Sequence, residues 1–164
     1  MMAERGFDAA RVLEAAEELE RAGEAFYQEA AEAVSDKQAK SLLLALAAAE
    51  VRHLRVIERI RAGLEKSFPV LSHGQDVSDL ATRFKELLFP EDPSSILSDT
   101  RKLTEIQALQ RGVRLERESI ELYEDAADRG VDPGVSNAFR RLVMEERIHL
   151  FVLNQRLDVL KLRS

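Results

Sequence analysis

The strongest constraint on this chain is a short motif, Glu-x-x-His, that occurs at residues 50–53 and again at 146–149. Residues three apart lie on the same face of an α-helix, so each copy directs a carboxylate and an imidazole to one side. A further glutamate lies thirty residues before each copy. Both halves of the chain therefore repeat one pattern of potential metal ligands. Its members are Glu20, Glu50, His53, Glu116, Glu146 and His149.

The composition is that of a globular domain. The chain has 164 residues, 45% hydrophobic and 33% charged, which suits one core and argues against disorder. The absence of cysteine excludes disulfides, iron–sulfur clusters and a rubredoxin-type module, and it suits a reducing compartment. No apolar run is long enough to span a bilayer, and no secretion signal opens the chain. We therefore expect a cytoplasmic protein, and the net charge of −6 argues against a nucleic-acid partner.

Four long segments rich in alanine, leucine, glutamate and arginine predict four helices. Ser35 and Gln38 have the spacing of a capping box at the start of the second helix. Gly130 is placed to end the third, and Asp132-Pro133 to open the fourth as N-cap and first helical residue. The predicted helices cover residues 8–34, 36–64, 100–129 and 133–161.

Each predicted helix carries an apolar stripe that is interrupted at mid-length by residues of the repeated pattern. A surface helix would place such residues on the opposite face. The stripe of the second helix shows the arrangement; it consists of Leu43, Leu46, Glu50, His53, Ile57, Ile60 and Leu64.

The segment 65–99 breaks the helical pattern with three prolines and one glycine, and within it residues 78–89 predict a short accessory helix. Because the segment is long enough to run the length of a bundle, the third helix can lie parallel to the second. The expected fold is all-α, a single domain formed by a four-helix bundle with one long crossover between helices 2 and 3.

Four carboxylates in one core would be very costly if they were ionised and unpaired. A bundle could protonate them, with pKa values raised by burial, or it could bind cations. Two divalent ions would balance four carboxylates and two neutral imidazoles. The alternative is that these are ordinary surface glutamates, since a single Glu-x-x-His is a weak signal. The matched pattern in both halves favours the metal site.

The pattern resembles the ferritin-like di-iron and di-manganese bundles, in which two helices give a Glu and two give a Glu-x-x-His. The sequence Leu-Glu-x-x-Gly-x-x-Phe-Tyr from Leu19 to Tyr27 is most similar to the rubrerythrin branch. By this resemblance, Glu50 and Glu146 would bridge two metal ions. Terminal ligands would be Glu20 and His53 on one ion and Glu116 and His149 on the other. Two Fe ions are expected, with Mn or Zn as other candidates.

The chain departs from the rubrerythrin pattern in three respects. It has no cysteine-bearing rubredoxin domain, so electrons would come from an external protein or small reductant. Ser119 stands where rubrerythrins carry an additional glutamate, so a ligand exchange by that glutamate is not expected. The insertion 65–99 is longer than the ferritin pattern has, and it could form a lid or an oligomer contact.

Several further residues lie near the predicted site. Tyr27 and Tyr123 each follow a ligand glutamate by seven residues and are either core aromatics, hydrogen-bond donors to ligands, or radical relays. Gly23 allows either close helix packing or a small pocket beside the metals. Glu145 could accept a hydrogen bond from a ligand histidine or could be a solvated surface charge. His73, in the insertion, has no acidic neighbour at ligand spacing and is taken as incidental.

The resemblance implies an oxidoreductase that reduces hydrogen peroxide, or dioxygen, at a dinuclear non-haem site. The alternatives are an iron-storage ferroxidase, a di-iron hydroxylase, a manganese catalase or a non-catalytic metal site. A homodimer or higher homo-oligomer is expected.

Overall fold

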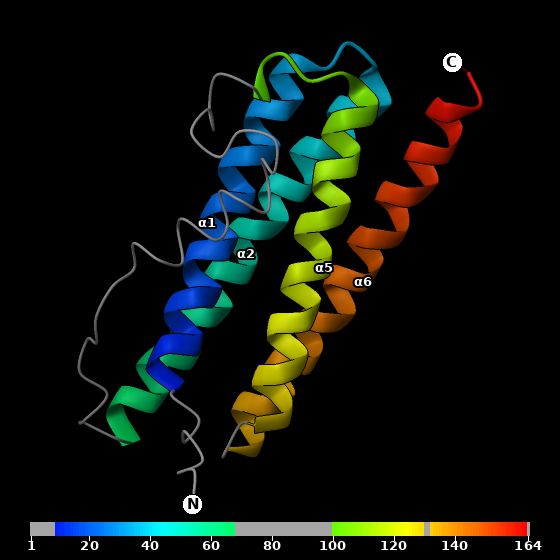
Figure 1. The fold of residues 1–164 in the computed structure, drawn as a ribbon. Coiled ribbons are helices and arrows are strands. Elements are labelled where there is room, and N and C mark those ends of the chain that lie inside the picture. Colours follow the sequence, from blue (N-terminus) through cyan, green and yellow to red (C-terminus); the bar gives the residue numbers. More distant parts are fainter. Residues whose placement is uncertain (1–8, 68–99, 130–131, 164) are drawn as a thin grey trace, which may run out of the picture.

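The computed structural model describes residues 9–67, 100–129 and 132–163, and these residues form a bundle of four long helices (Figure 1). The all-α bundle predicted from the sequence is confirmed. The helices are α1 (Ala9–Ala33), α2 (Lys37–Ser67), α5 (Glu105–Arg129) and α6 (Pro133–Lys161). The predicted accessory helix at 78–89, Gly130 and His73 lie outside the described residues.

Two helix starts differ from the sequence prediction. The N-cap of α2 is Asp36 rather than Ser35, because Oδ1 of Asp36 accepts from the backbone N–H of Ala39 at 2.8 Å. Helix α5 begins at Glu105, not near residue 100, because Thr104 and Gln107 form a reciprocal cap. In each case a better cap lies one or a few residues beyond the predicted one.

The start of α6 follows the prediction. Asp132 is its N-cap, with Oδ1 accepting from the backbone N–H of Val135 at 3.0 Å, and Pro133 is the first helical residue. At its C-terminal end, α2 continues three residues beyond the predicted end at residue 64, to Ser67.

The helices pair as two hairpins, α1 with α2 and α5 with α6, which meet through α1 on α5 and α2 on α6. Helix α5 starts beside the α1–α2 turn, where the backbone N–H of Ser35 donates to the Glu105 side chain at 2.9 Å. Helix α2 ends at the opposite end of the bundle, so α2 and α5 run in the same direction (Figure 1). This is the arrangement expected for bundles with one long crossover.

Two apolar clusters fill the bundle, one on each side of its middle. On α2, the first cluster contains Leu43 and Leu46 and the second contains Ile57. On α6 the order is reversed, with Leu142 in the second cluster and Leu153 in the first. The Glu-x-x-His motifs lie between the two clusters on both helices. The apolar packing of the ends thus holds the polar residues of the middle in fixed positions.

Candidate metal centre

All six residues of the repeated pattern converge at the middle of the bundle. Their potential ligand atoms form two groups of four residues and a third group of His53, Glu146 and His149, and within each group the atoms lie within 4.8 Å of one another. Glu50 and Glu146 belong to both groups of four. The first group adds Glu20 and His53, and the second adds Glu116 and His149. Each group of four thus has two residues that it shares with the other group and two that it does not share. A dinuclear site with bridging carboxylates has this pattern.

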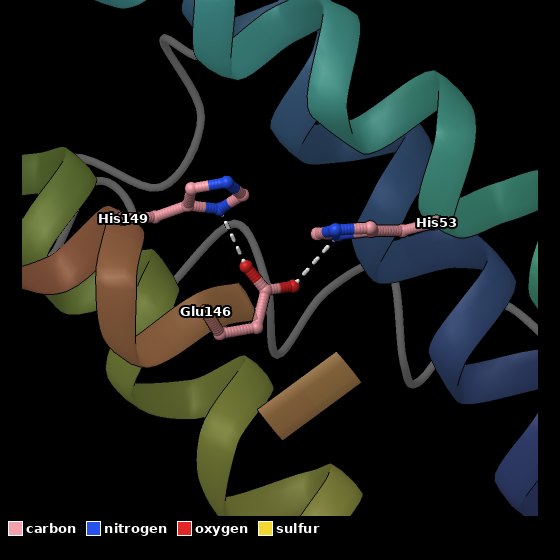
Figure 2. A group of neighbouring side chains, drawn as sticks. All are labelled: His53, Glu146 and His149. Atoms are coloured by element: carbon pink, nitrogen blue, oxygen red, sulfur yellow. Dashed lines mark hydrogen bonds and ion pairs between the residues drawn. The ribbon is translucent and has the colours of Figure 1, made fainter. Parts of the chain in front are cut away.

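Glu146 shows the sharing most directly, because each of its oxygens faces a different imidazole (Figure 2). Its Oε1 lies 3.0 Å from Nδ1 of His53, and its Oε2 lies 2.8 Å from Nδ1 of His149. The two imidazole rings are nearly parallel, with centroids 5.4 Å apart. Both histidines therefore present Nδ1 to the same carboxylate, from α2 on one side and α6 on the other.

The cluster is buried, and several of its polar atoms lack hydrogen bonds. Five of the six residues are at most 3% exposed, and only the His149 side chain, at 14%, reaches the edge of the protein. Within the cluster, four buried ligand-type atoms have no hydrogen-bond partner among the described residues. These atoms are Glu20 Oε2, His53 Nδ1, Glu116 Oε2 and Glu146 Oε1. Such atoms are costly in a dry interior. Because all four face the centre of the cluster, they fit a cation-binding site.

The electrostatics of the cluster favour protonated side chains on several of its members. Burial raises the pKa of Glu50 well above its ordinary value, and the neighbouring Glu20 raises it further. Burial and the nearby Glu146 also raise the pKa of Glu116 to about 8, although His149 acts against this. At neutral pH, Glu116 therefore holds a proton in the metal-free protein, and the pKa of Glu50 is shifted in the same direction.

The pKa values of the two histidines and of Glu146 are shifted in the directions that ion pairs between them produce. Burial alone would lower both histidine pKa values, but Glu146 and Glu20 raise that of His53 to about 11. Glu116 and Glu146 raise the pKa of His149 to about 9. Burial would raise the pKa of Glu146, but its contacts with His149 and His53 lower it to about 2. Glu146 is thus the permanent anion between two protonated imidazoles.

Both tyrosines donate hydrogen bonds to carboxylates of the opposite hairpin. The Tyr27 hydroxyl on α1 donates to Oε1 of Glu116 on α5 at 2.5 Å. The Tyr123 hydroxyl on α5 donates in the same way to Oε1 of Glu20 on α1. Burial raises the pKa of each phenol well above its ordinary value, so both hydroxyls keep their protons for donation. Each tyrosine leaves one oxygen, Oε2, of its carboxylate free to face the cluster.

Gly23 makes room for Glu50. A Cβ at residue 23 would lie 3.1 Å from Cδ of Glu50 and 3.2 Å from Cδ2 of Leu115. Of the two roles considered from the sequence, this geometry supports close packing. The equivalent residue of the other half, Ser119, turns its hydroxyl back to the carbonyl oxygen of Leu115 at 3.2 Å and away from ligation.

Glu145 contacts the outer nitrogen of His53, at 3.0 Å between Oε2 and Nε2, although its side chain is 52% exposed. The contact crosses from α6 to α2, so the partner of Glu145 is a histidine of the other hairpin. Of the two roles expected for Glu145, a hydrogen-bond acceptor for a ligand histidine and a solvated charge, the side chain fills both.

The fold and the buried carboxylate and imidazole residues define a ferritin-like helical bundle with a candidate two-metal site. The rubrerythrin family profile matches residues 11–156, which is most of the chain and includes all six residues, and the chain belongs to that family. No curated protein and no solved structure gives a significant match. No helix in the described ranges is long and apolar enough to cross a membrane.

Proposed function

We propose that this protein binds two metal ions, iron in the first place, and reduces hydrogen peroxide or dioxygen with electrons from an external donor. The observation that carries the proposal is the sharing of Glu50 and Glu146 between two groups of ligand-type atoms. Membership of the rubrerythrin family supports the same conclusion.

The residues would hold the two ions in the order that the two groups suggest. Glu20 and His53 would be terminal ligands of one ion, and Glu116 and His149 of the other. A set of carboxylate oxygens with one imidazole per ion suits iron or manganese, and zinc could also bind. When bound, a pair of such ions supplies electrons and Lewis acidity for the two-electron reduction of a small oxidant.

The protein's own contribution is to orient the ligands, exclude water and control access. The tyrosine hydroxyls fix the outer oxygens of Glu20 and Glu116, so that the inner oxygens remain directed at the centre. The apolar clusters on both sides keep bulk water out. His149 is the part of the site nearest to solvent, and we propose that a small oxidant enters along its edge.

The 164 residues contain no cysteine for an iron–sulfur or rubredoxin-type centre. We therefore propose a separate reductant, either a rubredoxin-like protein or a reductase. We also propose that the chain forms a homodimer or higher homo-oligomer in a cytoplasmic setting.

Anaerobic loading with Fe²⁺, followed by stopped-flow mixing with peroxide or with oxygen, tests the activity. We expect two iron atoms per chain to be oxidised by one peroxide, with reduction by an added donor restoring the starting spectrum. Absence of oxidation by either oxidant would contradict the proposal. Gel filtration separates it from iron storage, because a dimer cannot enclose a mineral core whereas a large cage can.

A further inference from the structure

The two halves of the site differ in the environment of the outer histidine nitrogens. The Nε2 atom of His53 lies 3.0 Å from the Glu145 carboxylate. Among the described residues, the Nε2 atom of His149 has no hydrogen-bond partner, and only its Nδ1 contacts carboxylates. The residue that corresponds to Glu145 in the first half is Ala49, which offers only a methyl group. The two halves therefore have the same candidate ligands, but only one of the two histidines has a carboxylate on its outer nitrogen.

Glu145 is directed at His53 although a cation lies near. Arg141 precedes Glu145 by one helical turn and lines the same 860 Å³ cavity between α2 and α6. An i, i+4 pair of this kind is often an ion pair on a helix surface. Across the described residues, however, Arg141 forms no ion pair with Glu145, whose carboxylate instead reaches across to α2. The contact with His53 is thus the one that orients this side chain.

A carboxylate on the outer nitrogen has a defined effect on an imidazole ligand. It places the proton on Nε2, leaves the lone pair of Nδ1 directed at the metal, fixes the ring orientation and increases the electron density of the ligand. Loss of such a partner typically lowers metal affinity by about 10- to 100-fold. In this protein Nδ1 of His53 faces Glu20 and Glu146, so the proton that Glu145 holds on Nε2 is the one that remains when Nδ1 gives up its own proton to bind a metal.

We propose that Glu145 is a positioning residue that makes the two metal positions unequal. The position formed by Glu20 and His53 binds its ion more tightly and fills first. The position formed by Glu116 and His149 binds more weakly and fills second. This inference rests on the proposed two-metal site but is independent of the oxidant that the site reduces.

The repeat provides a matched pair of variants for the test, with Co²⁺ alone as the probe. Glu116→Ala removes a terminal ligand from the second position, and Glu20→Ala removes the equivalent ligand from the first. Glu145→Gln is then added to each, and binding is followed by calorimetry and by cobalt absorption. We expect Glu145→Gln to weaken Co²⁺ binding by about 10- to 100-fold in the Glu116→Ala protein. We expect no change in the Glu20→Ala protein.

A control and a direct probe separate this effect from a general loss of charge. Glu58→Gln removes an exposed carboxylate from α2, one to two turns beyond His53, and should change neither background. In ¹⁵N-detected imidazole spectra of the metal-free protein, the Nε2–H signal of His53 should be protected from exchange and should lose that protection in Glu145→Gln.

The possible failures are distinct. An equal effect of Glu145→Gln in both backgrounds, or an effect in neither, would overturn the inequality and leave the two-metal site intact. Failure of the unsubstituted protein to bind more than one Co²⁺ per chain would overturn the proposed function itself.

Discussion

The Tyr27 hydroxyl on α1 lies 2.5 Å from Oε1 of Glu116 on α5, which is 89 residues later in the chain. Tyr123 and Glu20 form the reciprocal contact, so each hairpin supports a ligand-type carboxylate of the other. These two hydrogen bonds tie together the hairpins at the level of the candidate site. The same two carboxylates are candidate metal ligands, so a change in these hydrogen bonds should affect both the stability of the fold and metal binding.

Replacement of either tyrosine by phenylalanine should therefore destabilise the protein. Tyr27→Phe leaves the buried Glu116 carboxyl without its donor, and Tyr123→Phe does the same to Glu20. We expect each variant to lose about 1–3 kcal/mol in the free energy of unfolding of the metal-free protein, measured by urea denaturation. A loss of less than a few tenths of a kcal/mol in both would show that these hydrogen bonds contribute nothing net.

Gly23 and Gly63 form a matched pair of helical glycines. A methyl group at residue 23 would press on the Glu50 carboxyl at 3.1 Å, whereas nothing lies within 4 Å of one at residue 63. We expect Gly63→Ala to stabilise the protein by about 0.5–1 kcal/mol through helix propensity and to leave metal binding unchanged. Gly23→Ala should weaken metal binding, because Glu50 must move. Equal metal affinity in the two variants, measured by calorimetry, would contradict the role assigned to Gly23.

The stability of the metal-free protein should fall as pH rises from about 4.5 to 9. The pKa of Glu116 is raised from its ordinary 4.5 to about 8, so its contribution to stability is complete below pH 4.5 and is lost as pH rises through 8. The pKa of His149 is raised from 6.5 to about 9, so its contribution is complete below 6.5 and is lost as pH rises through 9. Both groups bind more protons in the folded state, and the free energy of unfolding must decrease with pH.

Thermal unfolding of the metal-free protein at several pH values measures this effect. A decrease in Tm of at least about 2–4 °C is expected, the change that each kcal/mol produces in a protein of this size. Glu146 acts in the opposite sense at low pH, since its pKa of about 2 adds stability above pH 4.5 that is lost on acidification. A Tm that rises steadily to pH 9 would be inconsistent with the protonated cluster.

Metal binding should release protons and become tighter as pH rises. Glu116 and both imidazoles hold protons in the metal-free protein at neutral pH, and the raised pKa of Glu50 favours its protonated form. Ligation requires the protons on these groups to leave. Calorimetry of Mn²⁺ binding in two buffers of different ionisation enthalpy counts the protons. We expect more than one proton released per chain at pH 7; zero release would mean that the metal binds elsewhere.

The sequence predicted which residues share a helix face, and this covered most of the fold and the six candidate ligands. The spacing of Glu50 and His53 within an apolar stripe fixes their direction on any regular helix, and the stripes require a common core. The length of the segment 65–99 then predicted that the third helix can lie parallel to the second. The helices and the shared faces were predictable because they depend on local periodicity, which is present in the sequence itself.

Contacts between helices were outside what periodicity can predict. The spacing of Tyr27 placed it on the stripe of Glu20, but its hydrogen bond goes to Glu116 on the facing helix. Glu145 likewise reaches His53 rather than a residue of its own helix. Such partners depend on the rotation and vertical offset of one helix against another, which only the packed bundle defines.

The helix starts were missed for a related reason. Ser35 satisfies the capping pattern, but Asp36 is also held by Arg156 of α6, a contact that joins residues 120 apart. This pairing helps to keep the pKa of Asp36 below its ordinary value, in second place to the hydrogen bond from Ala39. The tertiary contact adds to the local cap, and the helix begins one residue later than the sequence pattern alone indicates.

Metal stoichiometry decides whether two metal ions share Glu50 and Glu146. Protein loaded anaerobically with Fe²⁺, desalted and analysed for iron should contain two atoms per chain, as should a control with exposed Glu121 changed to alanine. Glu146→Ala, which removes the carboxylate between the two imidazoles, should contain one atom or fewer. Two iron atoms retained in Glu146→Ala, or no more than one in the unsubstituted protein, would contradict the account.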